Sequence, residues 1–325
     1  MNRQDWQPVA SLETLRARSG LLNRIRAFFV AAGVMEVETP IACRAAATDP
    51  ALESLRTSWS GPTGATVHLH LHTSPELAMK RLLAAGSGPV YQICKVFRGS
   101  ERGRFHHPEF SLLEWYRPGW SYKQLMEEVA GLVRHALGQS ARPVEILTYR
   151  ELFLERLGLD PWQAGLGELR DCAREYAIAG AEDLALTHDG WLDLLLTHRL
   201  EAGLGIGRLT FVCDYPASQA ALARIRPGPN AVAERFELYL DGMELANGFQ
   251  ELTDVGEQRR RFSSDLELRR SAGLTQPPVD DAFIAALAAG MPEASGVALG
   301  LDRLLMVLTR SRHIDEVLAF PVERA

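Results

Sequence analysis

Apolar residues in the first tenth of the chain recur at the spacing of an α-helix. The stripe ends at Gly33, a residue type that commonly follows a helix. Its members are Leu21, Leu22, Ile25, Phe28, Phe29 and Ala32. A second helical pattern runs over residues 77–85, after the turn Ser74-Pro75-Glu76. We therefore expect a helix before residue 33, another over 77–85, and a loose polar arm over residues 1–11.

Alternating apolar positions predict strands in later segments of the chain. Residues 91–97 and 110–116 form one predicted pair, and a second pair turns at Asp241-Gly242, a strong hairpin signal. Residues 296–301 predict a strand of small residues that leads into a helix. Because hairpins join the consecutive strands, an α+β fold with an antiparallel sheet flanked by helices is favoured over parallel βαβ winding.

Composition narrows the class of protein. The chain has 325 residues, 46% hydrophobic and 23% charged, a balance typical of globular proteins. A formal net charge of −6 argues against a general nucleic-acid binder. The four cysteines show no CxxC spacing, so no zinc site is predicted. The longest apolar stretches are about half of the ~20 residues that a bilayer span needs. We predict a single domain over residues 1–325 in a cytoplasmic protein that does not enter the membrane.

The segment between the first two predicted strands is strongly cationic. It contains Arg98, Arg102 and Arg104, together with two histidines. Arginines gathered in one loop can bind polyphosphate oxygens bidentately, and glycines allow the backbone to approach a ligand closely. An aromatic ring at the loop exit, Phe110, can stack on a planar base. The alternative is an ordinary solvated charged loop.

Three further segments are candidates for chemistry. Glu244 and Glu251 are seven residues apart, and a bend at Asn247-Gly248 would bring both carboxylates to one side, as a Mg²⁺ site requires. Glu76 and Glu114 could form an anionic pocket for an amine, with Tyr116 as its wall. Residues 296–303 leave one strand face open to a flat ligand. The alternatives are surface acids, acids paired to local arginines, and a tightly packed strand–helix junction.

Taken in order, residues 33–40, 97–116 and 296–303 resemble motifs 1, 2 and 3 of class II aminoacyl-tRNA synthetases, with the greatest likeness to lysyl-tRNA synthetases. The resemblance implies a class II catalytic core, ATP, Mg²⁺ and a homodimer formed through motif 1. Lysyl-tRNA synthetases carry an anticodon-reading β-barrel before motif 1. Here motif 1 begins within the first 35 residues, so we expect no anticodon-binding domain.

The shorter architecture resembles the elongation factor P–(R)-β-lysine ligases in two segments, Val297-Ala298-Leu299-Gly300 and Glu114-Trp115-Tyr116-Arg117-Pro118. Those enzymes activate (R)-β-lysine as an adenylate and transfer it to a lysine ε-amine of elongation factor P. The resemblance implies the same ligase activity, with elongation factor P as partner and no stable tRNA binding. The alternatives are a truncated lysyl-tRNA synthetase paralogue that loads L-lysine onto tRNA or a small molecule, and a non-catalytic amino-acid sensor.

The resemblance also implies roles for individual residues. Arg98 and Arg303 are the implied catalytic residues, and Glu244 and Glu251 the implied metal ligands. The implied ATP site consists of Arg98, Gly99, Ser100, Glu101, His107, Phe110, Glu244, Leu245, Gly300 and Arg303. The implied amino-acid site consists of Ser74, Pro75, Glu76, Glu114, Tyr116, Glu251 and Ala298.

The chain departs from the lysyl-synthetase pattern at three places. Arg-Asn-Glu becomes Arg98-Gly99-Ser100, which moves the acid to Glu101, and His107 replaces an asparagine. Ala298 replaces a glycine in motif 3, and this difference matches the β-lysine ligases.

Overall fold

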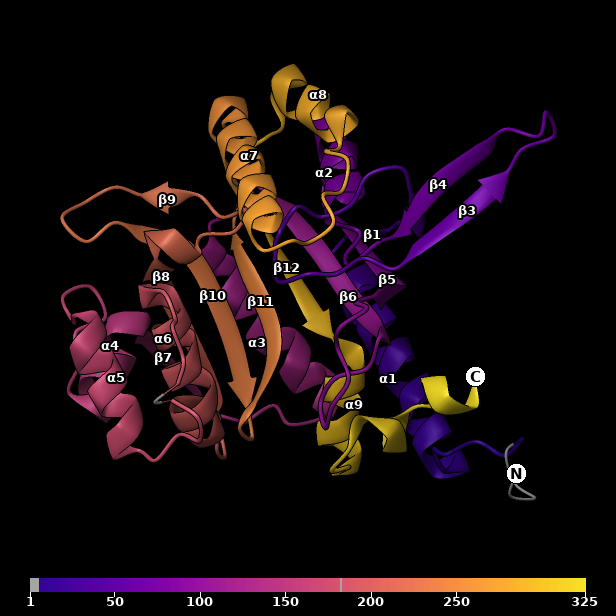
Figure 1. Ribbon diagram of the computed structural model, residues 1–325. Coiled ribbons are helices and arrows are strands. Elements are labelled where there is room, and N and C mark those ends of the chain that lie inside the picture. The colour runs from indigo at the N-terminus through magenta and orange to yellow at the C-terminus, as the bar shows by residue number, and fades with distance from the viewer. Residues whose placement is uncertain (1–5, 182) are drawn as a thin grey trace. The chain divides into compact units, whose positions relative to one another are not determined.

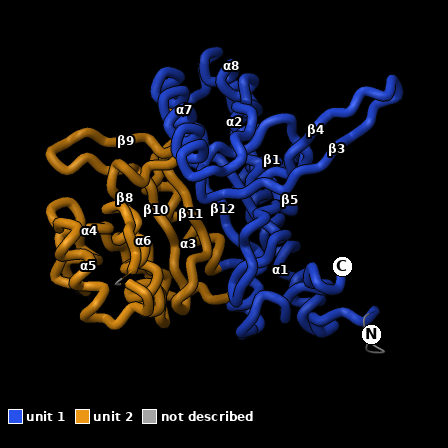
Figure 2. The backbone as a smooth tube through the Cα atoms, in the orientation of Figure 1, with its two compact units in different colours: residues 1–120, 135–137, 253–325 blue, residues 121–134, 138–252 orange. Residues whose placement is uncertain are grey.

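The computed structural model describes residues 6–181 and 183–325, and it confirms the α+β class (Figure 1). The chain divides into two compact units (Figure 2). Unit 1 comprises residues 1–120, 135–137 and 253–325, and unit 2 comprises residues 121–134 and 138–252. Within the described part of the chain, no helix has the length and apolar character needed to cross a membrane. The single domain expected over residues 1–325 stays a prediction.

Unit 1 contains a four-stranded arrangement in the order β1-β5-β6-β12. The bounds are β1 (Met35–Glu36), β5 (Val90–Phe97), β6 (Glu109–Pro118) and β12 (Ala294–Gly300). The predicted hairpin is confirmed, since β5 and β6 are antiparallel, as are β6 and β12. The short strand β1 is parallel to β5, a pairing that the sequence did not predict.

A separate three-stranded sheet extends away from the rest of unit 1 (Figure 1). Its strands, in the order β2-β4-β3, are β2 (Ala42–Cys43), β3 (Arg56–Ser60) and β4 (Thr66–Leu71). The helices of unit 1 are α1 (Leu12–Ala31), α2 (Glu76–Ala84), α7 (Val255–Ser271), α8 (Asp281–Gly290) and α9 (Leu301–Thr309), followed by the short turns η4 (Ile314–Val317) and η5 (Val322–Arg324).

Helix α1 begins where a serine can cap it. The Ser11 side chain accepts from the Thr14 N–H at 3.0 Å, and Gly33 follows the helix with a positive φ of 65°. The buried ring of Phe29 stacks on Tyr91 with centroids 4.3 Å apart, which holds α1 against β5. Residues 1–5 of the expected arm lie outside the described residues. Val9 and Ala10 are not loose, because their N–H groups donate to Ala319 and Leu318.

Unit 2 contains four strands in the order β11-β10-β8-β7, and β9 pairs with β10. The bounds are β7 (Val144–Thr148), β8 (Leu209–Pro216), β9 (Ile225–Arg226), β10 (Val232–Leu240) and β11 (Met243–Gln250). The helical segments are α3 (Tyr122–Leu137, its end in unit 1), α4 (Tyr149–Leu157), α5 (Leu166–Glu175), α6 (His188–Leu195), η1 (Leu196–Leu200), η2 (Glu201–Gly203) and η3 (Ala217–Gln219). A buried cluster that includes Tyr149, Phe153 and Trp191 gives this unit its own hydrophobic core.

The turn between β10 and β11 is the one that the sequence predicts. Asp241 and Gly242 have φ values of 51° and 74°, the left-handed conformations of a type I′ hairpin. A side chain at Gly242 would also meet the backbone of Ala202 at 3.1 Å, so glycine is required there on both counts.

Candidate active site

The candidate substrate face of unit 1 lies along β6 and β12. Directly opposite residues on antiparallel strands point to the same side of a sheet. Glu114 pairs with Ala298, Tyr116 with Gly296, and Leu112 with Gly300. One face therefore carries bulky or polar side chains on β6 and small residues on β12. Phe110 continues the same row at the start of β6, two residues before Leu112. Fold and register thus bring together residues that the sequence separates by almost two hundred positions.

Glu114 is the most strongly perturbed acid on this face. It is only 2% exposed, and its two carboxylate oxygens accept hydrogen bonds from Ser74 Oγ and Tyr116 Oη, both at 2.6 Å. Ser74 Oγ also accepts from the Glu76 N–H at 3.0 Å, so the turn before α2 is tied to β6. Ser74 and Tyr116 therefore both contact the buried carboxylate of Glu114, and an anionic pocket for an amine at this place stays a prediction.

The pKa of Glu114 is raised to about 7, first by burial and then by the negative charge of Glu76. The hydrogen bonds from Ser74 and Tyr116 and the charge of Lys80 act in the opposite direction. Lys80 is buried, and its Nζ lies 2.5 Å from Glu76 Oε1. Sequence reasoning missed this lysine as part of the pocket, although its spacing four residues after Glu76 on a helix was a usable signal.

Arg98 lies at the other end of the face, beside Phe110. Its guanidinium carbon is 5.0 Å from the centroid of the Phe110 ring. Nη1 donates to Glu101 Oε1 at 3.1 Å, and Nε donates to the Thr73 carbonyl at 3.5 Å. The acid that the sequence displaces to position 101 thus reaches Arg98 from the loop. An anion such as a phosphate could compete with Glu101 for the same guanidinium.

Arg303 is held by the loop between β5 and β6. Its Nε donates to the Phe105 carbonyl at 3.2 Å, and its Nη2 lies 2.8 Å from His106 Nε2. A side-chain carbon added at Gly300 would lie 3.7 Å from the Arg303 side chain, so these two predicted ATP residues are neighbours. The loop therefore touches both predicted catalytic arginines.

The three loop arginines do not converge on one site. Arg102 is paired with Asp315 and Glu323, and Arg104 donates to the Arg312 carbonyl. Only Arg98 remains beside Phe110. Arg102 is separated from Arg98 in its interactions, because Arg102 pairs with Asp315 and Glu323, two acids that are distant in sequence.

The remaining predicted loop residues lie as follows. The Gly99 N–H donates to the Glu53 carbonyl at 2.8 Å, and Ser100 is exposed. His107 is buried, with Nδ1 2.6 Å from the Glu109 carbonyl, and its Nε2 accepts from the Val322 N–H at 2.9 Å. His107 therefore serves the local fold, and its contact with ATP stays a prediction.

Glu244 and Glu251 lie at the two ends of β11 in unit 2. The expected bend at Asn247-Gly248 is wrong, since both residues continue the ladder opposite Glu237 and Phe236. Instead, the register shifts so that Leu238 pairs with Ala246 and Tyr239 with Glu244, which leaves Leu245 as the extra residue of a β-bulge. Side chains along a strand alternate between the two faces of the sheet, and the extra residue shifts this alternation by one position. Glu244 and Glu251, which are seven residues apart, therefore lie on the same face. Glu251 is buried just beyond the strand end.

Asn247 is a polar residue on this face that was not among the predicted site residues. Its Oδ1 accepts from Arg235 Nε at 3.2 Å, and Arg235 Nη2 lies 2.5 Å from Glu237 Oε1. Glu237 also accepts from the hydroxyls of Tyr215 and Tyr239. This satisfied buried network holds the Asn247 amide in one orientation.

The predicted metal ligands are two acids, Glu244 and Glu251. Among residues 6–181 and 183–325, no group of three or more histidine, cysteine, aspartate or glutamate side chains is placed to hold a metal ion. Two carboxylates suit Mg²⁺ when phosphate oxygens and water supply the other ligands.

Burial raises the pKa of Cys94 and of Cys213 to about 12, so neither thiol is suited to act as a nucleophile.

Comparison with known proteins identifies the family of the chain. The family model of tRNA synthetases class II (D, K and N) matches residues 5–324. An elongation factor P–(R)-β-lysine ligase from Erwinia tasmaniensis is 47% identical over 323 residues, covering 98% of this chain and 98% of the relative. Enzymes of the same name from Edwardsiella ictaluri and Proteus mirabilis are each 46% identical, covering 98% and 99% of this chain and 98% of either relative. The chain therefore belongs to the class II tRNA synthetases and, within them, to the family of the elongation factor P–(R)-β-lysine ligases.

Proposed function

We propose that the chain is a ligase that activates (R)-β-lysine with ATP and attaches it to a lysine side chain of elongation factor P. The amino-acid carboxylate attacks the α-phosphorus of ATP, and pyrophosphate leaves. The acceptor ε-amine then attacks the carbonyl of the adenylate, and AMP leaves as the amide forms. The observation that carries the proposal is the single face of β6 and β12, with the buried carboxylate of Glu114 at one end and Arg98 beside Phe110 at the other.

The residues of this face have two proposed roles, ATP binding and amino-acid binding. Arg98 would bind the α-phosphate and neutralise charge that develops there, and Arg303 with Phe110 would hold the adenine. Glu114, Ser74 and Tyr116 would bind an amino group of the substrate, since a buried carboxylate attracts a cation. Pro75 and Glu76 shape the turn beside them, and Lys80 offsets the charge of Glu76. Catalysis would rest on positioning and charge neutralisation, without a covalent nucleophile.

Mg²⁺ fits the donor set of unit 2. Glu244 and Glu251 would hold it, and the bulge at Leu245 supports this assignment because it gives the two carboxylates a shared face. When bound, the ion would screen the negative charge of the triphosphate. Both acids are thereby proposed as ATP-site residues, and Glu251 also as a residue of the amino-acid site.

The finer features of the proposal concern partners and location. The names of the relatives support elongation factor P as acceptor. We also propose a cytoplasmic homodimer that does not bind tRNA stably. The test is intact-mass analysis of purified elongation factor P after incubation with the chain, ATP and either (R)-β-lysine or L-lysine. A mass gain of one lysyl group with the β isomer is expected. Efficient charging of tRNA-Lys, with no change in elongation factor P, would contradict the proposal.

Ala298→Gly is expected to weaken the discrimination between lysine isomers. The Ala298 methyl group lies opposite Glu114 on the proposed substrate face. We expect it to fill space that an α-amino group would use. One methyl-sized clash is typically worth about 10- to 200-fold in specificity. The variant should gain kcat/KM for L-lysine relative to (R)-β-lysine in pyrophosphate exchange. An unchanged ratio would show that Ala298 only packs the strand.

The KM for the amino acid is expected to fall as pH rises through 7. The pKa of Glu114 is raised to about 7, so the acid is protonated below that value and loses its attraction for an ammonium group. Cation binding favours the ionised form, and linkage predicts a KM about 10-fold higher at pH 6 than at pH 8. The same raised pKa stabilises the fold below about pH 4.5, and this contribution is lost as pH rises through 7.

The measurement is the amino-acid KM in pyrophosphate exchange at pH 6, 7 and 8. Glu114→Gln should have a higher KM for the amino acid, and this KM should not depend on pH. Glu76→Gln should move the wild-type profile to lower pH, because the charge of Glu76 contributes to raising the pKa of Glu114. A wild-type KM that is equal at pH 6 and pH 8 would contradict the assignment.

A further inference from the structure

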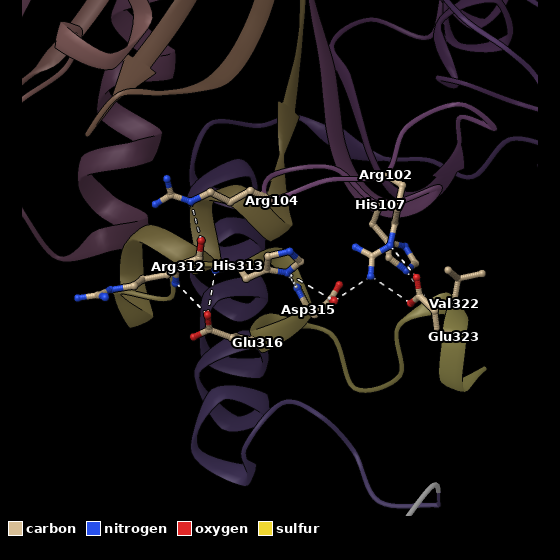
Figure 3. Close-up of polar contacts among 9 residues, drawn as sticks. All are labelled: Arg102, Arg104, His107, Arg312, His313, Asp315, Glu316, Val322 and Glu323. Atoms are coloured by element: carbon tan, nitrogen blue, oxygen red, sulfur yellow. Dashed lines mark hydrogen bonds and ion pairs between the residues drawn. The ribbon is translucent and has the colours of Figure 1, made fainter. Parts of the chain in front are cut away.

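The loop between β5 and β6 is fastened to the C-terminal segment, residues 312–323 (Figure 3). Arg102 makes the central contact. Its Nη2 lies 2.8 Å from Asp315 Oδ2, and its Nε and Nη2 lie 2.8 and 3.1 Å from the two carboxylate oxygens of Glu323. One guanidinium therefore joins two acids that are eight residues apart. Figure 3 shows Arg102 turned toward both acids.

Two more loop residues attach to the same segment. Arg104 Nε donates to the Arg312 carbonyl at 2.9 Å, and the Ile314 N–H donates to the Arg104 carbonyl at 2.9 Å. His107 Nε2 accepts from the Val322 N–H at 2.9 Å (Figure 3). Arg102, Arg104 and His107 thus fix the loop on both sides of Phe105.

The C-terminal segment is itself anchored. Glu316 Oε1 accepts from the N–H groups of Arg312 and His313, which closes the turn at the start of the segment. Arg18 on α1 donates to the Val317 carbonyl at 2.9 Å. Further along, the N–H groups of Val9 and Ala10 donate to carbonyls at 319 and 318. The segment is therefore a fixed support for the loop.

The fixed part of the loop is the part that holds Arg303. Arg303 contacts the Phe105 carbonyl and His106 Nε2, and both residues lie between the anchored positions 104 and 107. We propose that residues 312–323 position the ATP site through this loop and that Arg102 is the principal positioning residue. The proposal rests on the proposed function, in which Arg98 and Arg303 contact ATP.

Global stability is not the main role expected of these contacts. The Arg102 and Glu323 side chains are 36% and 56% exposed, and exposed ion pairs contribute little to the stability of a whole fold. A loop is more sensitive, because each residue that is left unfixed gains conformational entropy that ligand binding must remove again. The loss of the pair should therefore appear in ATP binding before it appears in unfolding.

A competing explanation makes the opposite prediction. Suppose that Arg102 itself binds a phosphate of ATP and that its ion pair with Glu323 competes with this binding. Glu323→Gln would then free Arg102 and lower the KM for ATP. If Arg102 positions the loop, Glu323→Gln raises that KM. The direction of the change thus separates a positioning residue from a residue that contacts the substrate.

The experiment measures ATP–pyrophosphate exchange for Glu323→Gln, Arg102→Ala and Arg102→Lys. Arg312→Ala is the matched control, because Arg312 makes its network contacts through its backbone carbonyl and N–H. We expect the KM for ATP to rise about 3- to 10-fold in the first two variants, with partial recovery in Arg102→Lys. The amino-acid KM, the unfolding temperature and the control should stay at wild-type values. Trypsin should also cleave after Arg104 faster in Glu323→Gln.

Two results would overturn the proposal on its own. One is a wild-type KM for ATP in both Glu323→Gln and Arg102→Ala, and the other is a lower KM in Glu323→Gln. A wild-type chain that shows neither ATP binding nor pyrophosphate exchange would overturn the proposed function instead, and this inference with it. Exchange by the wild type therefore distinguishes the two failures.

Discussion

Arg98→Ala is expected to reduce kcat/KM for ATP–pyrophosphate exchange by about 100- to 1000-fold, the usual effect of removing a group that stabilises developing charge. Arg98 is half-buried beside Phe110 and forms an ion pair with Glu101, which, like a phosphate group, is an anion. A guanidinium in this place can exchange a carboxylate for a phosphate oxygen without moving far. Arg98→Lys should recover only part of the loss, because an ammonium group lacks the bidentate geometry.

The measurement is exchange at saturating amino acid, with circular dichroism as a check on folding. Arg174→Ala is a suitable control, because Arg174 is an arginine of α5 paired with Asp171 one helical turn away. Exchange within a few-fold of wild type in Arg98→Ala, with the fold intact, would remove Arg98 from the proposed mechanism.

Glu244→Gln and Glu251→Gln should each abolish exchange, with a loss of about 100- to 1000-fold. Each change keeps the shape of the side chain and removes the negative charge that a divalent cation needs. The β-bulge at Leu245 is a backbone feature, so neither substitution should alter it. A readout apart from activity is the Mg²⁺ dependence of ATP binding in calorimetry, which should weaken in both variants.

The control for this pair is Glu267→Gln on α7, where the acid is exposed and paired with Arg270. Near-normal exchange in both Glu244→Gln and Glu251→Gln, with unchanged circular dichroism, would show that neither acid serves the reaction.

The fold was predictable wherever a local signal was sufficient. The hairpin at Asp241-Gly242 needs two positive φ values, and few residue pairs other than Asp-Gly supply them. Helix α1 follows from its apolar stripe and from Gly33 at its end. The candidate site was predictable as a set of residue types in order, since Arg98, Phe110, Glu114 and Ala298 fall in the segments that resemble the class II motifs.

Most of the wrong predictions concern contacts that local sequence signals do not reveal. The three loop arginines do not converge, because Arg102 pairs with Asp315 and Glu323, which are more than two hundred residues away in sequence. The parallel pairing of β1 with β5 was missed because strand direction depends on the path of the chain between them. The bend in β11 was misplaced because a bulge depends on pairing with the partner strand, which has no local sequence signature here.

The sequence by itself determined the elements, the family and the chemical types at the site, because periodicity, turn residues and ordered motifs are local properties of the chain. Only the tertiary structure decided the environment of each group. Burial and the neighbouring Glu76 raise the pKa of Glu114, and register places Ala298 opposite it. Two acids of the C-terminal segment form ion pairs with Arg102. Electrostatic energies depend on distance and on exclusion of water, and both are known only once the chain has folded.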